Sequence, residues 1–283
     1  GNKFLSHIRE VDAIVQVLRH FQDTDIVHVE GGVDPLRDRE IINTELIFAD
    51  LEQIEKSLPA LQKKAKISQN KDEGKVVAIL EKIQEVLNRG ELANTIRSEL
   101  SAEDLKLIRS YNFLTLKPFV YALNIAQEDL ANAEVLKSEY EAKLNAPVAI
   151  VCVKLESEMM EFSAEERAEF INELLEISGE KKIPTLDDLI SLAFNQLGLM
   201  YYFTTGEKET RAWTIPLNST APQAAGAIHS DFERGFIKAE VISTEKLLEA
   251  GSRSAARDKG QIRLEGKDYI VQDGDVIVFK FNV

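Results

Sequence analysis

The chain has 283 residues, 44% of them hydrophobic and 29% charged, a composition typical of a folded globular protein and not of a disordered one. Its formal net charge of −14 argues against broad binding of naked nucleic acid and against sequence recognition of DNA. No apolar stretch approaches the roughly 20 residues of a membrane-spanning helix, so we expect no membrane partner. A single cysteine, Cys152, excludes an intramolecular disulfide and indicates a cytoplasmic protein in which this thiol is a small buried residue.

The charge is unevenly distributed along the chain. From Leu199 onward, 11 Lys and Arg residues face 12 Asp and Glu residues, whereas residues 1–198 hold 23 against 36. A nearly neutral C-terminal part therefore follows a strongly acidic body. If one part contacts RNA by electrostatic attraction, the sequence favours the C-terminal part.

The first predicted elements are a helix and an apolar strand. Residues 3–12 place four apolar side chains on one helical face, those of Phe4, Leu5, Ile8 and Val11. Residues 12–21, DAIVQVLRHF, are mostly apolar, which predicts a strand buried on both faces, as in a parallel sheet. Turns follow at Gly31-Gly32 and at Asp34-Pro35.

The next segment predicts an antiparallel helical hairpin. Residues 38–67 carry apolar side chains at near-helical spacing, and residues 68–75, SQNKDEGK, form a polar break. A second helix is predicted over residues 76–90, with Gly90 ending it. Nothing in this hairpin suggests catalysis, so we interpret it as a solvated helical pair that acts as a lever or provides a surface for a partner.

Two further apolar runs predict the remaining strands of a parallel sheet. One covers residues 119–123 and ends at Asn124, and the other covers residues 148–153 after a helical stretch. Alternation of buried strands with helices is typical of an α/β fold. Because ligands bind beyond the carboxyl ends of such strands, residues 124–127 and 152–154 are candidate binding loops.

The last third of the chain predicts helices followed by a small β-grasp module. N-cap patterns open helices at Ser101, at Ser163 and at Thr185. A hairpin over residues 200–215 turns around Gly206-Glu207-Lys208, and one helix is predicted over residues 221–236. Strands over 237–243 and 267–283 complete the module, the second hinged on Asp273-Gly274.

Three stretches resemble one family of P-loop NTPases. GNKFLSHI, at the start, resembles the segment after switch II in Obg-related proteins, and VDPLRDREIINTELIFADLEQIEK resembles the junction of G domain and helical insertion in one branch. RAWTIPLNSTAPQAAGAIHSDFERGFIKAEVIS and EGKDYIVQDGDVIVFKFNV resemble the TGS domain of that branch. The branch is the YchF family, whose eukaryotic member is called Obg-like ATPase. The resemblance covers essentially all 283 residues in order.

The resemblance implies four regions. Residues 1–40 and 101–198 are expected to be two parts of a G domain, residues 41–100 a helical hairpin or coiled-coil insertion, and residues 199–283 a TGS domain. The implied enzyme is a ribosome-associated NTPase that binds and hydrolyses ATP, or GTP, with Mg²⁺ in translation or stress response. In the family, roughly 85 residues with the phosphate-binding loop and switches precede this opening helix. The sequence contains no G-x-x-x-x-G-K-[ST], so we expect no Mg²⁺ ligand and no catalytic residue within it.

The resemblance assigns base recognition to the two candidate loops. The family has Asn-x-x-Glu in place of the Asn-Lys-x-Asp of GTPases, which removes the carboxylate that pairs with guanine and implies a preference for ATP. Asn124 is expected to touch the base, and Ile125 to offer its main chain to the adenine amino group. Gln127 departs from the family Glu, and its amide both donates and accepts, so the choice between ATP and GTP stays open.

The second loop, Cys152-Val153-Lys154, aligns with the Ser-Ala-Lys of GTPases. Val153 is expected to supply a main-chain N–H to the base, and Lys154 to pack its stem on the ring. We expect no metal site at the histidines, since none has a second ligand at metal spacing. The acidic pairs Glu156/Glu158 and Glu165/Glu166 are interpreted as solvated helix faces.

A second reading of the function stays open. Without a phosphate-binding loop, residues 1–283 can serve as a non-enzymatic ribosome or RNA adaptor through the hairpin and the TGS domain. A weaker third reading is a protein-docking scaffold that uses only the acidic hairpin.

Overall fold

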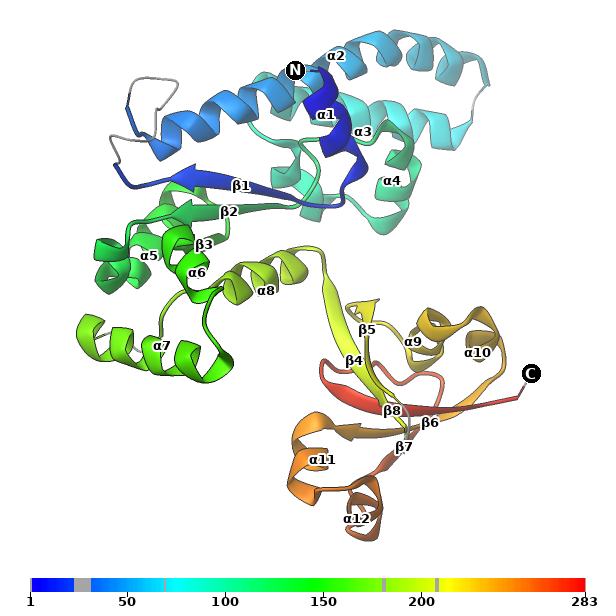
Figure 1. Ribbon diagram of the computed structural model, residues 1–283. Coiled ribbons are helices and arrows are strands. Elements are labelled where there is room, and N and C mark those ends of the chain that lie inside the picture. Colours follow the sequence, from blue (N-terminus) through cyan, green and yellow to red (C-terminus); the bar gives the residue numbers. More distant parts are fainter. Residues whose placement is uncertain (1, 23–31, 69, 180–181, 207–208, 283) are drawn as a thin grey trace. The chain divides into compact units, whose positions relative to one another are not determined.

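The computed structural model describes residues 2–22, 32–68, 70–179, 182–206 and 209–282 (Figure 1). They form two compact units, Gly1–Gln196 and Leu197–Val283. None of the helices described is long and apolar enough to cross a membrane. The predicted turn at Gly31 and the residues Glu207 and Lys208 of the predicted hairpin turn lie outside the described residues.

The first unit contains a three-stranded parallel sheet, in agreement with the predicted α/β class. Its strands are β1 (Ile14–Arg19), β2 (Phe119–Asn124) and β3 (Val148–Val151), in the order β1-β2-β3. The opening helix α1 (Asn2–Glu10) precedes β1. Every residue of β2 and β3 is buried except Asn124, which is half-buried. The apolar runs therefore predicted both strands, but the second ends at Val151, and Val153, which was expected within it, begins the next helix and is 52% exposed.

Strand β1 is not buried on both faces, and that expectation was wrong. Gln16 and Leu18 are buried, whereas Val15 is 41% exposed and Val17 is 63% exposed. The alternation arises because successive side chains of β1 point to opposite faces, and only the face with Gln16 and Leu18 packs into the core of the described residues. An apolar run alone does not distinguish a strand buried on both faces from one buried on a single face.

The predicted hairpin consists of α2 (Pro35–Ser68) and α3 (Lys71–Asn88), which pack against each other (Figure 1). The expected break over residues 68–75 is too long. Helix α3 begins at Lys71 because the Asn70 side chain accepts a hydrogen bond from the N–H of Asp72 at 3.0 Å. Gly90 follows the helix with a φ of 78°, as its predicted terminating role requires.

A buried carboxylate joins the hairpin to the sheet. Asp50, in α2, is fully buried and accepts hydrogen bonds from the N–H groups of Leu114 and Thr115 at 3.1 and 2.8 Å. The Thr115 hydroxyl donates a third at 2.7 Å, and the Arg9 guanidinium lies 3.7 Å away. Burial raises the pKa of Asp50, against the opposite effect of these hydrogen bonds. The loop that enters β2 is thus held directly by α2.

Short helices connect the strands of the first unit. The 3₁₀ helix η1 (Ala93–Glu99), α4 (Ala102–Leu107) and the 3₁₀ helix η2 (Arg109–Tyr111) lead into β2, and η3 (Gln127–Asn132) and α5 (Ala133–Leu144) connect β2 to β3. Helices α6 (Val153–Met159), α7 (Ala164–Ser178) and α8 (Leu186–Gln196) complete the unit. The capping boxes predicted at Ser101 and Ser163 are both present.

The second unit is a mixed five-stranded sheet with helices, as expected for a β-grasp. Its strands are β4 (Leu199–Thr205), β5 (Thr210–Pro216), β6 (Phe236–Ser243), β7 (Arg263–Glu265) and β8 (Asp275–Phe281), in the order β5-β4-β8-β6-β7. Strands β4 and β8 are parallel, and the other neighbours are antiparallel. The predicted hairpin is therefore β4 with β5.

The single helix predicted over residues 221–236 is two helices. Helix α9 (Ala221–Ile228) ends at His229, whose extended backbone interrupts the helix before α10 (Ser230–Arg234). The imidazole Nδ1 of His229 accepts a hydrogen bond from the N–H of Asp231 at 3.2 Å and so caps the second helix. Helices α11 (Thr244–Ala250) and α12 (Arg253–Asp258) lie where no element was predicted.

Candidate functional site

The two predicted binding loops meet at one edge of the parallel sheet. Asn124 and Val151 are aligned in the register of β2 and β3, so both strands end at the same level. The Val153 N–H donates a hydrogen bond to Asn124 Oδ1 at 3.2 Å. Residues 29 positions apart in sequence are therefore in direct contact, as a shared site at the carboxyl ends of parallel strands requires.

The main chain of Ile125 presents an acceptor and no donor. Its N–H donates to the Val151 carbonyl at 2.9 Å and continues the ladder beyond the strands. Its side chain is 2% exposed and fixes the loop in the core. The Ile125 carbonyl accepts no hydrogen bond from the part of the chain that the structure describes.

Gln127 and Lys154 lie on the same two loops but differ in their contacts. Gln127 Nε2 donates to Glu158 Oε2, on α6, at 2.9 Å, which leaves Gln127 Oε1 as an acceptor. Lys154 is exposed and its ammonium has no partner among the described residues. Val153 is 52% exposed, so its side chain and that of Lys154 both lie at the surface. The loops thus offer a cation and an exposed aliphatic surface beside the Asn124 amide.

The cysteine of the second loop is buried. Cys152 is 1% exposed, and burial raises the pKa of its thiol. A raised thiol pKa disfavours the reactive thiolate, which agrees with the expected role as a small core residue. Nowhere in the described ranges do three His, Cys, Asp or Glu side chains gather as they do around a metal ion.

Residue His20 is a neighbour of the site that the sequence did not indicate. It follows β1, and its N–H donates to the Asn124 carbonyl at 2.9 Å. Its Nδ1 lies 3.1 Å from the Tyr140 hydroxyl, and the two rings meet edge to face. The same rule that identified the other two loops, the residue just beyond a parallel strand, would have identified His20.

Two carboxylates interpreted as solvated are engaged instead. Glu156 Oε2 lies 3.3 Å from Nη2 of Arg167, and Glu156 Oε1 accepts from the N–H of Leu186 at 2.7 Å. This second contact caps α8 and connects it to α6. Glu158 holds Gln127, as described above, so both side chains have structural partners.

Known proteins resemble the chain over its whole length. It is 48% identical over 286 residues to "Ribosome-binding ATPase YchF" of Haemophilus influenzae and 47% identical over 289 residues to the protein of that name from Bacillus subtilis; each alignment covers 100% of the chain and 76% of the relative. The chain belongs to the YchF/Obg-like ATPase family.

Other members of the family agree with this assignment. "Obg-like ATPase 1" of Gallus gallus is 38% identical over 288 residues, with 71% of its length covered. The structure of the Schizosaccharomyces pombe YchF GTPase superposes with a TM-score of 0.82 at 34% identity and covers 99% of this chain and 75% of that one. The family model described as "YchF-GTPase_C: Protein of unknown function (DUF933)" matches residues 199–282. The chain thus spans about three quarters of the length of its YchF relatives.

Proposed function

We propose that the first unit reads the purine base of a nucleotide, preferentially ATP, and that the protein acts as a ribosome-associated ATPase in the cytoplasm. The observation that carries this proposal is the 3.2 Å hydrogen bond between Asn124 Oδ1 and the Val153 N–H, which joins the two expected base loops. The Nδ2 group of Asn124 has no partner among the described residues and remains a donor for a ring nitrogen.

The hydrogen-bonding groups of the loops favour adenine over guanine. Adenine carries an amino donor at the position where guanine carries the O6 acceptor. The Ile125 N–H already donates to the Val151 carbonyl, so the main chain of Ile125 can offer the base only its carbonyl oxygen. A carbonyl oxygen accepts a hydrogen bond from the amino group of adenine. The Val153 N–H is the donor that guanine O6 needs and the group expected above to reach the base, but it donates to Asn124 Oδ1 instead. Binding of GTP thus requires Asn124 to release Val153 first.

Hydrolysis and metal binding need groups other than those of the base loops. Relatives named ATPases imply that a nucleotide is bound. The resemblance assigns the triphosphate and Mg²⁺ to the phosphate-binding loop and switches of the family, which supply charge neutralisation of the phosphates. The residues of this chain orient the base: Asn124 and Ile125 hold its edge, and Lys154 packs its stem along the ring.

Nucleotide titration tests the base site. Fluorescent ATP and GTP are titrated against the protein together with any natural sequence that precedes Gly1. We expect ATP to bind at least as tightly as GTP, and Asn124→Ala to weaken ATP binding about tenfold, because each lost hydrogen bond removes about 1–1.5 kcal/mol. The matched control is Asn132→Ala, since Asn132 is exposed and makes no side-chain capping bond. A clear preference for GTP contradicts the assignment.

Ribosome co-sedimentation tests the partner. Relatives are named ribosome-binding, and we propose that the β-grasp unit provides an RNA contact in this chain. Deleting residues 199–283 is expected to reduce co-sedimentation, and an unchanged result rejects that role. Retained co-sedimentation without any nucleotide binding supports the adaptor reading instead.

A further inference from the structure

A pocket of about 400 Å³ lies beside the loop that leads into β2. Its lining contains four cations and one carboxylate, a formal charge of +3, provided by Arg97, Lys106, Arg109, Lys117 and Asp12. It adjoins the amino end of β2, whereas Asn124 is at the carboxyl end, roughly 15–20 Å along the strand. This cationic pocket is therefore separate from the base loops.

The fold creates this positive charge by separating residues that are mixed in the sequence. Glu99 of η1 and Glu103 of α4 turn towards α3, where they pair with Lys82 at 2.6 Å and Lys75 at 3.2 Å. The cations of the same segments, Arg97 and Lys106, line the pocket instead. Acidic side chains are thus paired on one side of the segment, and basic side chains gather on the other.

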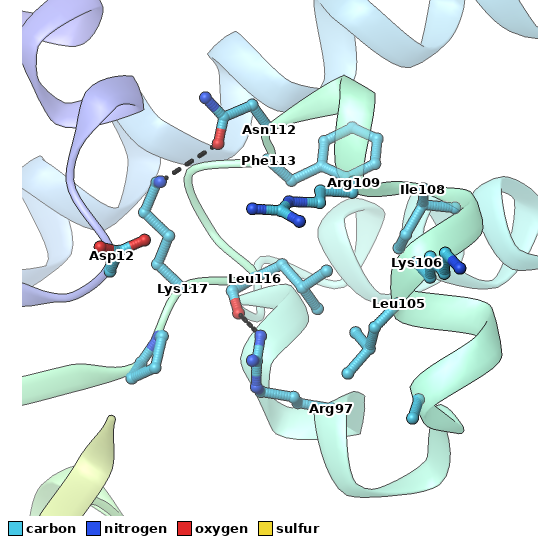
Figure 2. A pocket seen from close by; sticks show the side chains of 12 residues that line it. Asp12, Arg97, Leu105, Lys106, Ile108, Arg109, Asn112, Phe113, Leu116 and Lys117 are labelled. Atoms are coloured by element: carbon cyan, nitrogen blue, oxygen red, sulfur yellow. Dashed lines mark hydrogen bonds between the residues drawn. The ribbon is translucent and has the colours of Figure 1, made fainter. Parts of the chain in front are cut away.

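Lys117 adds a buried cation to the wall of the pocket, and burial lowers the pKa of its ammonium group. It is buried, and its ammonium donates to the carbonyls of Arg9 and Val11 and to the side-chain oxygen of Asn112. Figure 2 shows the last of these contacts at the edge of the pocket. All three ammonium protons have acceptors, so Lys117 contributes charge but no free donor.

The other three cations of the pocket, Arg97, Lys106 and Arg109, have N–H groups that donate to no described residue. Arg109 lies in the middle of the pocket (Figure 2), and neither it nor Lys106 has a side-chain partner among the described residues. Arg97 donates only one N–H, to the Leu116 carbonyl at 3.0 Å. An unpaired guanidinium presents a planar set of N–H donors that matches the oxygens of a phosphate group.

Arg97 is shared by the cationic pocket and a second cavity. The second cavity, of about 670 Å³, also shares Pro118; its lining further includes Glu91 and Arg39, which pairs with Glu40 at 2.6 Å. A backbone with several phosphates can place successive groups on the two sides of Arg97. An isolated phosphate can occupy only one of the two cavities.

We propose that the cationic pocket binds the phosphate backbone of a single-stranded RNA segment. This contact rests on the proposed association with the ribosome, where RNA is the available polyanion. Elsewhere the acidic body repels RNA, and a local charge of +3 directs the backbone to this position. Two or three phosphate contacts give weak binding by themselves and a marked dependence on salt.

The test uses residues 1–283, a fluorescein-labelled decauridylate and fluorescence anisotropy at two salt concentrations. The variant is Lys106→Ala with Arg109→Ala, and the matched control is Lys63→Ala with Lys66→Ala, two exposed cations of α2. We expect the pocket variant to bind at least about fivefold more weakly and the slope of log K against log salt to fall by about 1–2. The control is expected to change affinity less than about twofold.

Three further measurements complete the test: thermal melting, competition by inorganic phosphate, and ATP titration. Unchanged melting by circular dichroism is expected for both variants, because neither loses an internal contact, and a lower affinity with unchanged melting supports the RNA contact. Equal binding by pocket variant and control overturns it. Complete displacement of the RNA by millimolar inorganic phosphate also overturns it, in favour of a site for free phosphate. ATP titration of the pocket variant separates the two proposals, since loss of the RNA contact leaves the base loops intact.

Discussion

The arginines of the second unit and those of the cationic pocket in the first unit differ in their partners. The second unit contains five arginines, and four of them form ion pairs with its own carboxylates. Arg253, Arg257 and Lys280 all lie near Glu240, at 2.9, 3.2 and 3.7 Å. The fifth arginine, Arg211, stacks on Trp213 at 4.1 Å. In the first unit, the arginines of the cationic pocket have no carboxylate partner among the described residues.

This difference shows that net charge does not locate a binding surface. The sequence favoured the nearly neutral C-terminal part for an electrostatic RNA contact, because the first 198 residues are strongly acidic. Pairing limits the arginines of the second unit as phosphate ligands, since a cation already bonded to a carboxylate must break that contact before it binds a phosphate. The acidic unit, which repels RNA on average, still contains three cations without a carboxylate partner among the described residues, namely Arg97, Lys106 and Arg109.

The largest expected effect concerns the interior of the first unit. Asp50→Ala leaves the N–H groups of Leu114 and Thr115 and the Thr115 hydroxyl without their acceptor. Burying three unpaired donors is expected to lower the free energy of unfolding by about 3–5 kcal/mol. Urea titration followed by far-UV circular dichroism measures this loss in the helix-rich first unit.

The same titration contains its own control in the second unit. Trp213 is the only tryptophan and lies in β5, so its fluorescence reports the second unit alone. We expect the fluorescence transition to stay in place. Glu55→Ala, an exposed position of the same helix, is expected to leave both transitions unchanged. A shift of the fluorescence transition with Asp50→Ala contradicts the independence of the two units.

A smaller effect is expected from the buried polar contact of the second unit. The Tyr202 hydroxyl donates to the Ala224 carbonyl at 2.8 Å, and the whole residue is buried. Tyr202→Phe removes this single donor, and we expect a loss of about 1–1.5 kcal/mol, seen only in the Trp213 fluorescence transition. A loss as large as that of Asp50→Ala would remove the distinction between the two interiors.

The smallest effect is expected from the ion cluster of the second unit. The contact with Arg253, together with Lys280 and Arg257, lowers the pKa of Glu240 from its ordinary value of 4.5. A lowered carboxyl pKa contributes stability above pH 4.5 that is lost as the pH falls through the folded-state value. Glu240→Gln should therefore cost less than about 1 kcal/mol at pH 7. Thermal melting at pH 7 and pH 3 checks that this difference disappears in acid.

Sequence patterns predicted most of the fold and the central contact of the site. The apolar runs over residues 119–123 and 148–153 predicted two strands, the second two residues too long, and the rule for parallel sheets brought their loops together. The pattern failed where long-range packing decides. It could not distinguish β1, which is buried on one face, from a strand buried on both, and it could not place the interruption at His229, which depends on a side-chain cap. The cationic pocket was also unpredictable, because it depends on which way Glu99 and Glu103 turn.

The hydrogen bonds of Asp50 to Leu114 and Thr115 couple the hairpin mechanically to the sheet. Helix α2 has 34 residues, so it is about 50 Å long, and Asp50 lies near its middle. From there the chain runs through Thr115 into β2, a buried strand that ends at Asn124. A tilt of the hairpin either moves this strand or breaks three short hydrogen bonds at once. We therefore expect a displacement of the hairpin tip to reach Asn124 at the carboxyl end of β2.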